Sequence, residues 1–199
     1  MSDLDRRNGL ERRRVRSCLW RRTQGEGLER FELSREGDRW ILSGTILAMD
    51  DHGPAEARYE VVCDEEWRTE RTEVTLRDST GERNLQLTAE RGRWYRDGHE
   101  ETAVRGCVDV DLEWSPSTNT IPIRRLGLSV GAGSGPLGMA WIRFPGLTIE
   151  PLSQTYHHSS ERRYRYTSRG GEFTAELEVD DEGVVLDYGG LWRRVEETP

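Results

Sequence analysis

The amino-acid sequence predicts a mainly β protein, in which many short antiparallel strands form a sheet, roll or barrel with one short helix. Apolar and polar residues alternate with a period of two along most of the chain. Turn-forming residues interrupt this alternation every eight to twelve residues or so, a spacing typical of all-β folds. Only one segment, at about residues 119–127, departs from the alternation.

The predicted strands follow one another with short turns between them. In the segment ARYEVVC, for example, Ala57, Tyr59, Val61 and Cys63 share one face. A hairpin turn is expected in DDEG, because Gly183 can adopt the positive φ of a tight turn. The segments expected to contain strands are 38–49, 57–63, 67–78, 84–90, 94–98, 107–114, 138–152, 161–168 and 172–195.

The exception to the alternation lies within STNTIPIRRLGLSVG. Asn119 or Thr120 can cap a helix, Pro122 suits its first turn, and Gly127 can end it. Apolar contacts would come from Ile121, Ile123 and Leu126. We therefore predict a short helix over about residues 119–127, followed by a glycine-rich loop.

Length and net charge limit the number of domains and the classes of binding partner. A chain of 199 residues is most simply one domain, here residues 1–199. Its net charge of -8 disfavours broad binding to nucleic acid or to anionic membranes, since both need a basic face. Neither a nucleic-acid partner nor stable membrane insertion is expected. The first 24 residues are locally basic, with eight Arg against three acidic residues. They form either a basic arm or, as we favour, the solvated approach to a first strand.

The remaining composition predicts a cytoplasmic protein without cofactors. Cys18, Cys63 and Cys107 lie far apart and form no CxxC pair, so neither a zinc site nor a disulfide framework is indicated. No apolar leader segment and no run of about 18 apolar residues occurs. Buried free thiols in a reducing compartment are expected.

Three motifs suggest chemistry that their surroundings do not support. GLSVG matches the nucleophile elbow GxSxG around Ser129, but the neighbouring sequence lacks the strand and helix that this elbow requires. GSGPLG matches a dinucleotide motif without a βαβ frame. His157 and His158 would point to opposite faces of a strand, which leaves too few ligands for a metal. No metal site is predicted.

An acidic face in CVDVDLEW offers two interpretations. Asp109 and Asp111 lie two apart on one predicted strand, so their side chains would be about 7 Å apart. That spacing could suit a hydrolase with two carboxylates. Ion pairing with Arg124, Arg125 or Arg143 is the interpretation we favour.

Three long strings also resemble a known family. CVDVDLEWSPSTNTIPIRRL, WIRFPGLTIEPLSQTY and the terminal YRYTS and FTAELEVDDEGVVLDYGGLWRR are similar to a bacterial and archaeal family described as putative glycolipid-binding proteins. The resemblance implies a spiral β-roll wrapped around one central helix. The family's functional label rests on likeness to lipoprotein carriers that shelter acyl chains, and it brings no established catalytic residues.

These observations lead to a principal hypothesis and two alternatives. The first is non-enzymatic binding or carriage of an amphiphile, with a glycolipid or similar molecule as partner, in a cleft with aromatic walls and polar groups at its mouth. The alternatives are a hydrolase acting on a sugar or lipid ester, and a structural or interaction protein without a small ligand. The oligomeric state stays open. The residues expected to bind the ligand are Asp109, Asp111, Arg124, Arg125, Trp141, Arg143, Tyr156, Tyr164, Tyr166 and Trp192.

Overall fold

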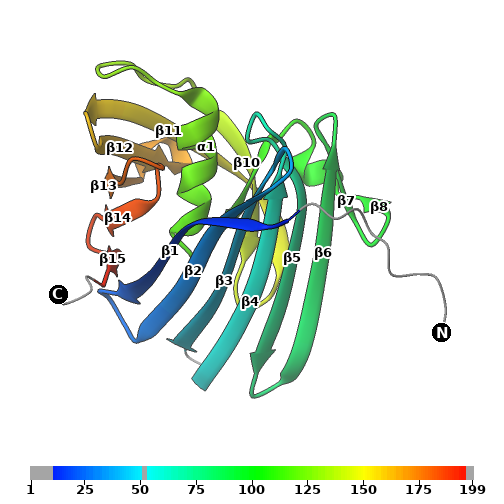
Figure 1. Ribbon diagram of the computed structural model, residues 1–199. Helices are drawn as coiled ribbons and strands as arrows, with labels where there is room; N and C mark the ends of the chain where they lie inside the picture. Colours follow the sequence, from blue (N-terminus) through cyan, green and yellow to red (C-terminus); the bar gives the residue numbers. More distant parts are fainter. Residues whose placement is uncertain (1–10, 51–52, 196–199) are drawn as a thin grey trace.

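A computed structural model describes residues 11–50 and 53–195 as one 15-stranded sheet with a single α-helix (Figure 1). The first half of the sheet contains β1 (Arg13–Arg22), β2 (Gly27–Glu36), β3 (Arg39–Asp50), β4 (Gly53–Cys63), β5 (Thr69–Asp78), β6 (Gly81–Glu90), β7 (Arg93–Arg96) and β8 (His99–Glu100). The second half contains β9 (Asp109–Leu112), β10 (Leu137–Arg143), β11 (Thr148–Ser160), β12 (Arg163–Ser168), β13 (Phe173–Val179), β14 (Val185–Tyr188) and β15 (Trp192–Arg194). The prediction of a mainly β fold with one short helix is confirmed.

Strand order brings the two ends of the described chain together in the middle of the sheet. β1 pairs with β2 on one side and with β15 on the other, and neighbouring strands are antiparallel except for the parallel pair β9 and β10. The sheet curls far enough for the Val110 N–H of β9 to reach Thr69 Oγ1 of β5, at 3.2 Å. The α-helix α1 (Thr120–Leu126) lies between the two halves (Figure 1).

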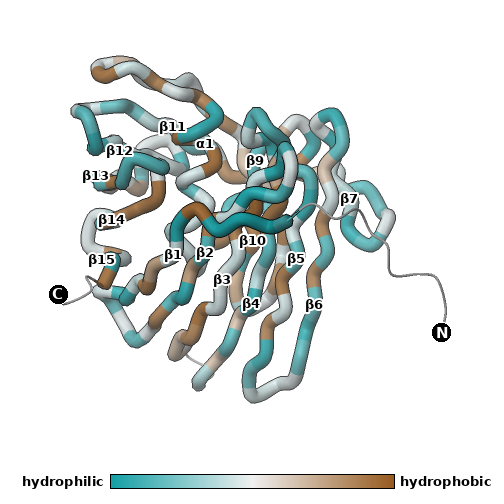
Figure 2. Tube along the Cα trace, viewed as in Figure 1, coloured by the Kyte–Doolittle hydropathy of each residue, from teal (hydrophilic) through white to brown (hydrophobic). Residues whose placement is uncertain are grey.

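The core follows directly from the period of two. Hydrophobic and hydrophilic residues alternate along the strands (Figure 2), and the hydrophobic set faces the interior. Trp20 of β1 is fully buried and packs against Phe31, with tilted rings whose centroids are 4.7 Å apart. It donates its indole N–H to Val185 O at 2.7 Å. This bond fastens β1 to β14 across the junction of the two halves.

The helix begins differently from the prediction and ends as predicted. A 3₁₀ helix, Ser117–Asn119, runs directly into α1, so the Asn119 side chain forms no capping bond. Asn119 instead donates to Pro116 O and accepts from the Tyr156 hydroxyl. The predicted cap was therefore wrong. Gly127 ends the helix in the left-handed region, with φ 52°.

The structure adds detail to two segments of the sequence. The segment 138–152 forms two antiparallel strands, β10 and β11, because Pro145 lacks a backbone donor and cannot continue a ladder. The basic cluster at 12–16 enters β1 itself, which begins at Arg13. Residues 1–10, which hold the rest of the predicted basic region, lie outside the described part of the chain.

Gly44 on β3 has a specific packing role. It lies opposite Tyr59 of β4, and a Cβ on Gly44 would approach the Tyr59 ring to 2.6 Å. We expect Gly44→Ala to lower the free energy of unfolding by about 1–3 kcal/mol, because the buried ring has to move. Urea denaturation would measure this. Gly133→Ala is the control, since its Cβ would meet His157 at an ordinary 3.5 Å, and equal losses in both variants would contradict the role of Gly44.

Candidate functional site

A cavity of about 220 Å³ lies where β9 and β10 face β12–β15. We call it the aromatic cavity, because large aromatic rings form much of its wall. Seven strands, β9 to β15, and the segment leading into α1 contribute to it, so distant parts of the sequence meet there. It is lined by Asp111, Leu112, Glu113, Ser115, Asn119, Trp141, Leu152, Tyr166, Ser168, Arg169, Phe173, Tyr188, Leu191 and Trp192.

Asp111 provides a carboxylate in the cavity wall. Its neighbours Val110 and Leu112 are buried in the core, and alternation turns Asp111 the other way. Protein surrounds the carboxyl group, although part of the residue stays accessible. Burial raises the pKa of Asp111 to about 6, a hydrogen bond from the Gln154 amide lowers it, and the charge of Glu113 raises it further. The carboxyl is thus charged at neutral pH and protonated below about pH 6.

Glu113 is held firmly at the same wall. One of its carboxylate oxygens accepts Arg143 Nε at 3.0 Å, and the other accepts the Phe144 N–H at 2.8 Å. The Arg143 guanidinium lies over the Trp141 ring, 4.1 Å from its centroid. Both partners of Glu113 therefore fix the position of the neighbouring aromatic wall.

Arg169 adds a cation at the cavity. Its guanidinium lies 5.0 Å from the Trp141 ring centroid, and no carboxylate among the described residues pairs with it. Arg22 plays a related part at Trp192, with its guanidinium 5.5 Å from that ring. Cations over aromatic faces keep the rings oriented and leave donors available to a ligand.

The aromatic rings of the wall pack edge to face. Tyr166 lies 5.9 Å from Phe173 and 5.8 Å from Tyr188, in T-shaped arrangements. Tyr156 packs against Tyr166 from behind, at 5.3 Å, and is fixed by its hydroxyl bond to Asn119 at 2.9 Å. These contacts hold the rings of the wall against one another.

The structure brings together some of the predicted site residues and separates others. Asp111, Trp141, Tyr166 and Trp192 line the aromatic cavity. Arg143 and Tyr156 support it from behind, through the contacts given above. The four other predicted residues, Asp109, Arg124, Arg125 and Tyr164, lie outside its lining.

Asp109 and Arg125 form a buried ion pair. Arg125 donates to both carboxylate oxygens of Asp109, with Nη2 at 2.6 Å and Nε at 2.9 Å, and the Asp109 side chain is fully buried. The predicted ion pairing is confirmed for Asp109. It was wrong for Asp111, whose partner is the amide of Gln154, because only Asp109 lies within reach of the last turn of α1.

Arg124 and Tyr164 line a different hollow, at the carboxyl end of α1. The Arg124 guanidinium lies 5.5 Å from the Trp67 ring centroid, and Tyr164 stacks on His158 at 4.3 Å. His158 Nδ1 is also 2.6 Å from Leu128 O. Among the described residues, no hydrogen bond joins the exposed Ser129 to a histidine, and no cluster of three or more ligands could hold a metal.

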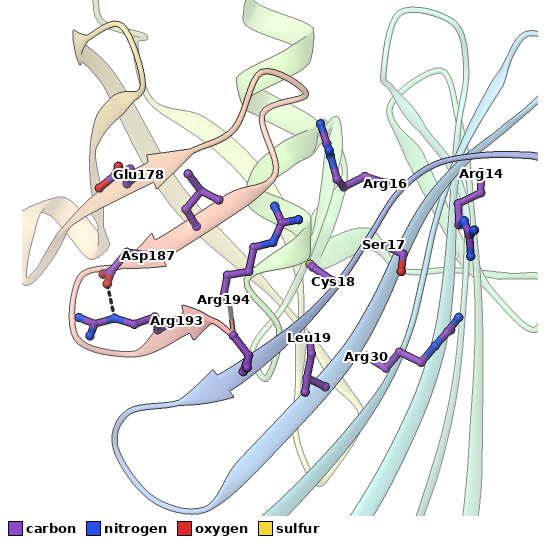
Figure 3. A pocket seen from close by; sticks show the side chains of 12 residues that line it. Arg14, Arg16, Ser17, Cys18, Leu19, Arg30, Glu178, Asp187, Arg193 and Arg194 are labelled. Atoms are coloured by element: carbon purple, nitrogen blue, oxygen red, sulfur yellow. Dashed lines mark hydrogen bonds and ion pairs between the residues drawn. The ribbon is translucent and has the colours of Figure 1, made fainter. Parts of the chain in front are cut away.

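A larger hollow, of about 1490 Å³, lies between β1 and the strands β14 and β15 (Figure 3). Several arginines line it, but two of them form ion pairs with Asp180. Arg16 Nε lies 3.1 Å and Arg194 Nη1 lies 3.2 Å from Asp180 Oδ2. Arg193 pairs with Asp187 at 2.9 Å, as the dashed line in Figure 3 marks. The Arg16–Asp180 pair joins β1 to the second half of the sheet, and the other two pairs lie within that half, so we assign this hollow a structural role.

Some residues of the aromatic cavity were absent from the predicted site. Phe173 and Tyr188 carried a signal, since each belongs to an alternating strand whose inward face could have been followed. Arg169 carried none, because its contact with Trp141 depends on the tertiary fold. The same holds for Arg22, which lies outside the lining and contacts Trp192 through the pairing of β1 with β15. The lining residues not predicted include Glu113, Ser115, Asn119, Ser168, Arg169, Phe173 and Tyr188.

In the described part of the chain, no helix is long and apolar enough to cross a membrane. No curated protein matches the sequence. The chain is similar to a crystal structure of a DUF1089 family protein from Pseudomonas aeruginosa, with 33% sequence identity and a TM-score of 0.77. That similarity covers 98% of this chain and 100% of the other.

A family model described as "Putative glycolipid-binding" matches residues 17–194. This range includes every residue that lines the aromatic cavity. The chain therefore belongs to the family that is described as "Putative glycolipid-binding".

Proposed function

We propose that the protein binds the hydroxyl-rich head group of an amphiphile, such as a glycolipid, in the aromatic cavity without converting it chemically. The observation that carries this proposal is the combination of aromatic walls with Asp111, Asn119 and Arg169 in one cavity. Sugar rings present apolar faces that pack on aromatic rings, and hydroxyl groups that donate to carboxylate and amide oxygens.

The size of the cavity supports a head group rather than a whole lipid. Cavities for drug-sized ligands measure about 300–1,000 Å³, and the aromatic cavity measures about 220 Å³. It has room for about one sugar ring. An acyl chain attached to that ring would have to leave the cavity.

Soluble glycosides test the proposal by quenching of tryptophan fluorescence. We expect n-octyl glucoside, below its micelle concentration, to bind about ten-fold more tightly than tetraethylene glycol monooctyl ether, which has the same chain without a sugar. Trp141→Ala and Asp111→Ala should each lower the affinity for octyl glucoside about ten-fold. Trp40→Ala is the matched control, because Trp40 stacks on Trp67 outside the cavity. Equal binding of the ether and the glucoside would contradict head-group recognition.

The titration of Asp111 gives a second readout. Its carboxylate accepts hydroxyl donors more strongly when ionised, and its pKa is about 6. Affinity for octyl glucoside should therefore rise between pH 5 and about pH 7.5. In Asp111→Asn this rise should disappear, and a persisting rise would assign the pH dependence to another group.

A hydrolase is the second candidate, because Asp111 and Glu113 share the cavity and the raised pKa of Asp111 is a property of general acids. Glu113 is poorly placed to act as the nucleophile or general base, since both its oxygens already accept hydrogen bonds from Arg143 and Phe144. Release of nitrophenol from 4-nitrophenyl glycosides, abolished in Asp111→Asn, would replace the binding proposal with this one.

A further inference from the structure

Asp111 differs from the two other carboxylates of its segment, because it has no cationic partner. Asp109 and Glu113 each pair with an arginine. Among the described residues, the Asp111 carboxylate forms no ion pair, and its hydrogen bond comes from the neutral amide of Gln154. The aromatic cavity therefore contains a carboxylate whose charge no cation of the described chain balances.

The charged groups nearest to Asp111 do not supply the missing cation. The charge of Glu113 has the same sign and adds to the effect of burial in raising the pKa of Asp111. The Arg143 guanidinium pairs with Glu113 and lies over the Trp141 ring. Arg169 lies over the same ring and is exposed, so solvent screens its charge. An ionised carboxylate surrounded by protein is costly without a partner, and a cation carried by a ligand would relieve that cost.

Aromatic rings surround Asp111 and would also favour a cation. In the parallel pair of β9 and β10, Asp111 lies directly beside Trp141. Burial raises the pKa of Tyr166 and of Tyr188, and the charge of Asp111 raises both further, so both rings lie close to this carboxylate. The faces of aromatic rings attract cations, and they do so most strongly where water is excluded. One carboxylate among several aromatic rings is an arrangement that recognises amines.

We propose that the head group bound in the aromatic cavity carries a protonated amine, and that Asp111 selects it. This inference rests on the proposed function and names the class of its ligand, an amino sugar joined to an apolar chain. The ammonium group would donate to the Asp111 carboxylate, and a hydrogen bond between two charged groups is stronger than one from a neutral hydroxyl. The aromatic cavity, at about 220 Å³, has room for one such ring.

Two octyl glucosides that differ in one substituent test the inference by quenching of tryptophan fluorescence at neutral pH. In n-octyl 6-amino-6-deoxyglucoside, a primary amine that is protonated at this pH replaces one hydroxyl of n-octyl glucoside. We expect wild type to bind the amine about ten-fold more tightly. In Asp111→Asn, which keeps the shape of the side chain, the two affinities should become equal. Glu176→Gln is the matched control, because it removes a carboxylate that is exposed and lies outside the cavity. It should retain the preference for the amine.

A change of pH gives a readout on the wild-type protein. Lowering the pH from about 7 to about 5 protonates Asp111, whose pKa is about 6, while an alkyl amine keeps its charge. The arginines at the cavity, Arg22, Arg143 and Arg169, also stay charged over this range. The preference for the amine should therefore disappear at about pH 5. In Asp111→Asn the ratio of the two affinities should not change with pH.

Several results would overturn the inference. They are a preference for the amine that persists at about pH 5 or in Asp111→Asn, and an equal loss of that preference in Glu176→Gln. Wild type that binds both glucosides with equal affinity would also overturn it, although the proposed function would then stand. Failure of both glucosides to bind would overturn the proposed function together with this inference.

Discussion

Arg125→Met is expected to lower the free energy of unfolding by about 3–5 kcal/mol, because it leaves the Asp109 carboxylate buried without its partner. Asp109 is fully buried, and both of its oxygens accept bonds from Arg125. The pair links β9 to the last turn of α1, so its loss also loosens the helix against the sheet. Urea denaturation at pH 7 measures the change.

Two further variants distinguish the effect of an unpaired buried charge from the effect of removing any arginine. Arg165→Met removes an ion pair with Glu176 in which both side chains are more than half exposed. It should lower the free energy of unfolding by no more than about 1 kcal/mol. Asp109→Asn combined with Arg125→Met removes the unpaired charge, so it should be more stable than Arg125→Met alone. Similar losses in Arg125→Met and Arg165→Met would contradict the assignment.

Stability should also fall as the pH rises from about 4.5 to about 8, because of Glu29. Its carboxyl is fully buried on β2 and accepts the Tyr59 hydroxyl at 2.5 Å and Ser115 Oγ at 2.8 Å, while Oε2 has no hydrogen-bond partner among the described residues. Burial raises its pKa from 4.5 to about 8, against the effect of these two bonds. The folded protein therefore retains a proton that the unfolded chain has released, so ionisation favours unfolding throughout this range.

Glu29→Gln should remove most of this pH dependence. Glutamine has nearly the same shape and carries no charge, so we expect the variant to be about 2–4 kcal/mol more stable than wild type at pH 8 and similar to it near pH 5. Asp111, with its pKa raised from 3.8 to about 6, acts in the same direction at lower pH and remains in both proteins.

Urea denaturation of both proteins at several pH values from 5 to 8 checks this expectation. Glu176→Gln, at an exposed position, is the control and should follow the wild-type curve. Parallel curves for wild type and Glu29→Gln would show that Glu29 does not set the pH dependence.

The position of Glu29 could have been inferred from the sequence. In GLERFELSRE, Phe31 and Leu33 identify the inward face of the strand, and Glu29 shares their parity. Its pKa could not have been inferred, because that depends on Tyr59 from β4 and on Ser115 from the segment before α1. Those neighbours are set by strand pairing between segments 30 and 86 residues apart.

By itself the sequence determined the strand-rich character of the chain from residue 38 onward, the shared face of segments such as 57–63, the single helix and its end at Gly127. These features depend on local periodicity and on the backbone preferences of single residues, which each segment carries with it. Only the tertiary structure decided that Trp141, Tyr166, Tyr188 and Trp192 meet around Asp111, while Asp109 on the same strand pairs with Arg125. The sheet order, its curvature and the placement of α1 bring together residues that are far apart in the sequence. Local sequence patterns do not determine which distant segments come into contact.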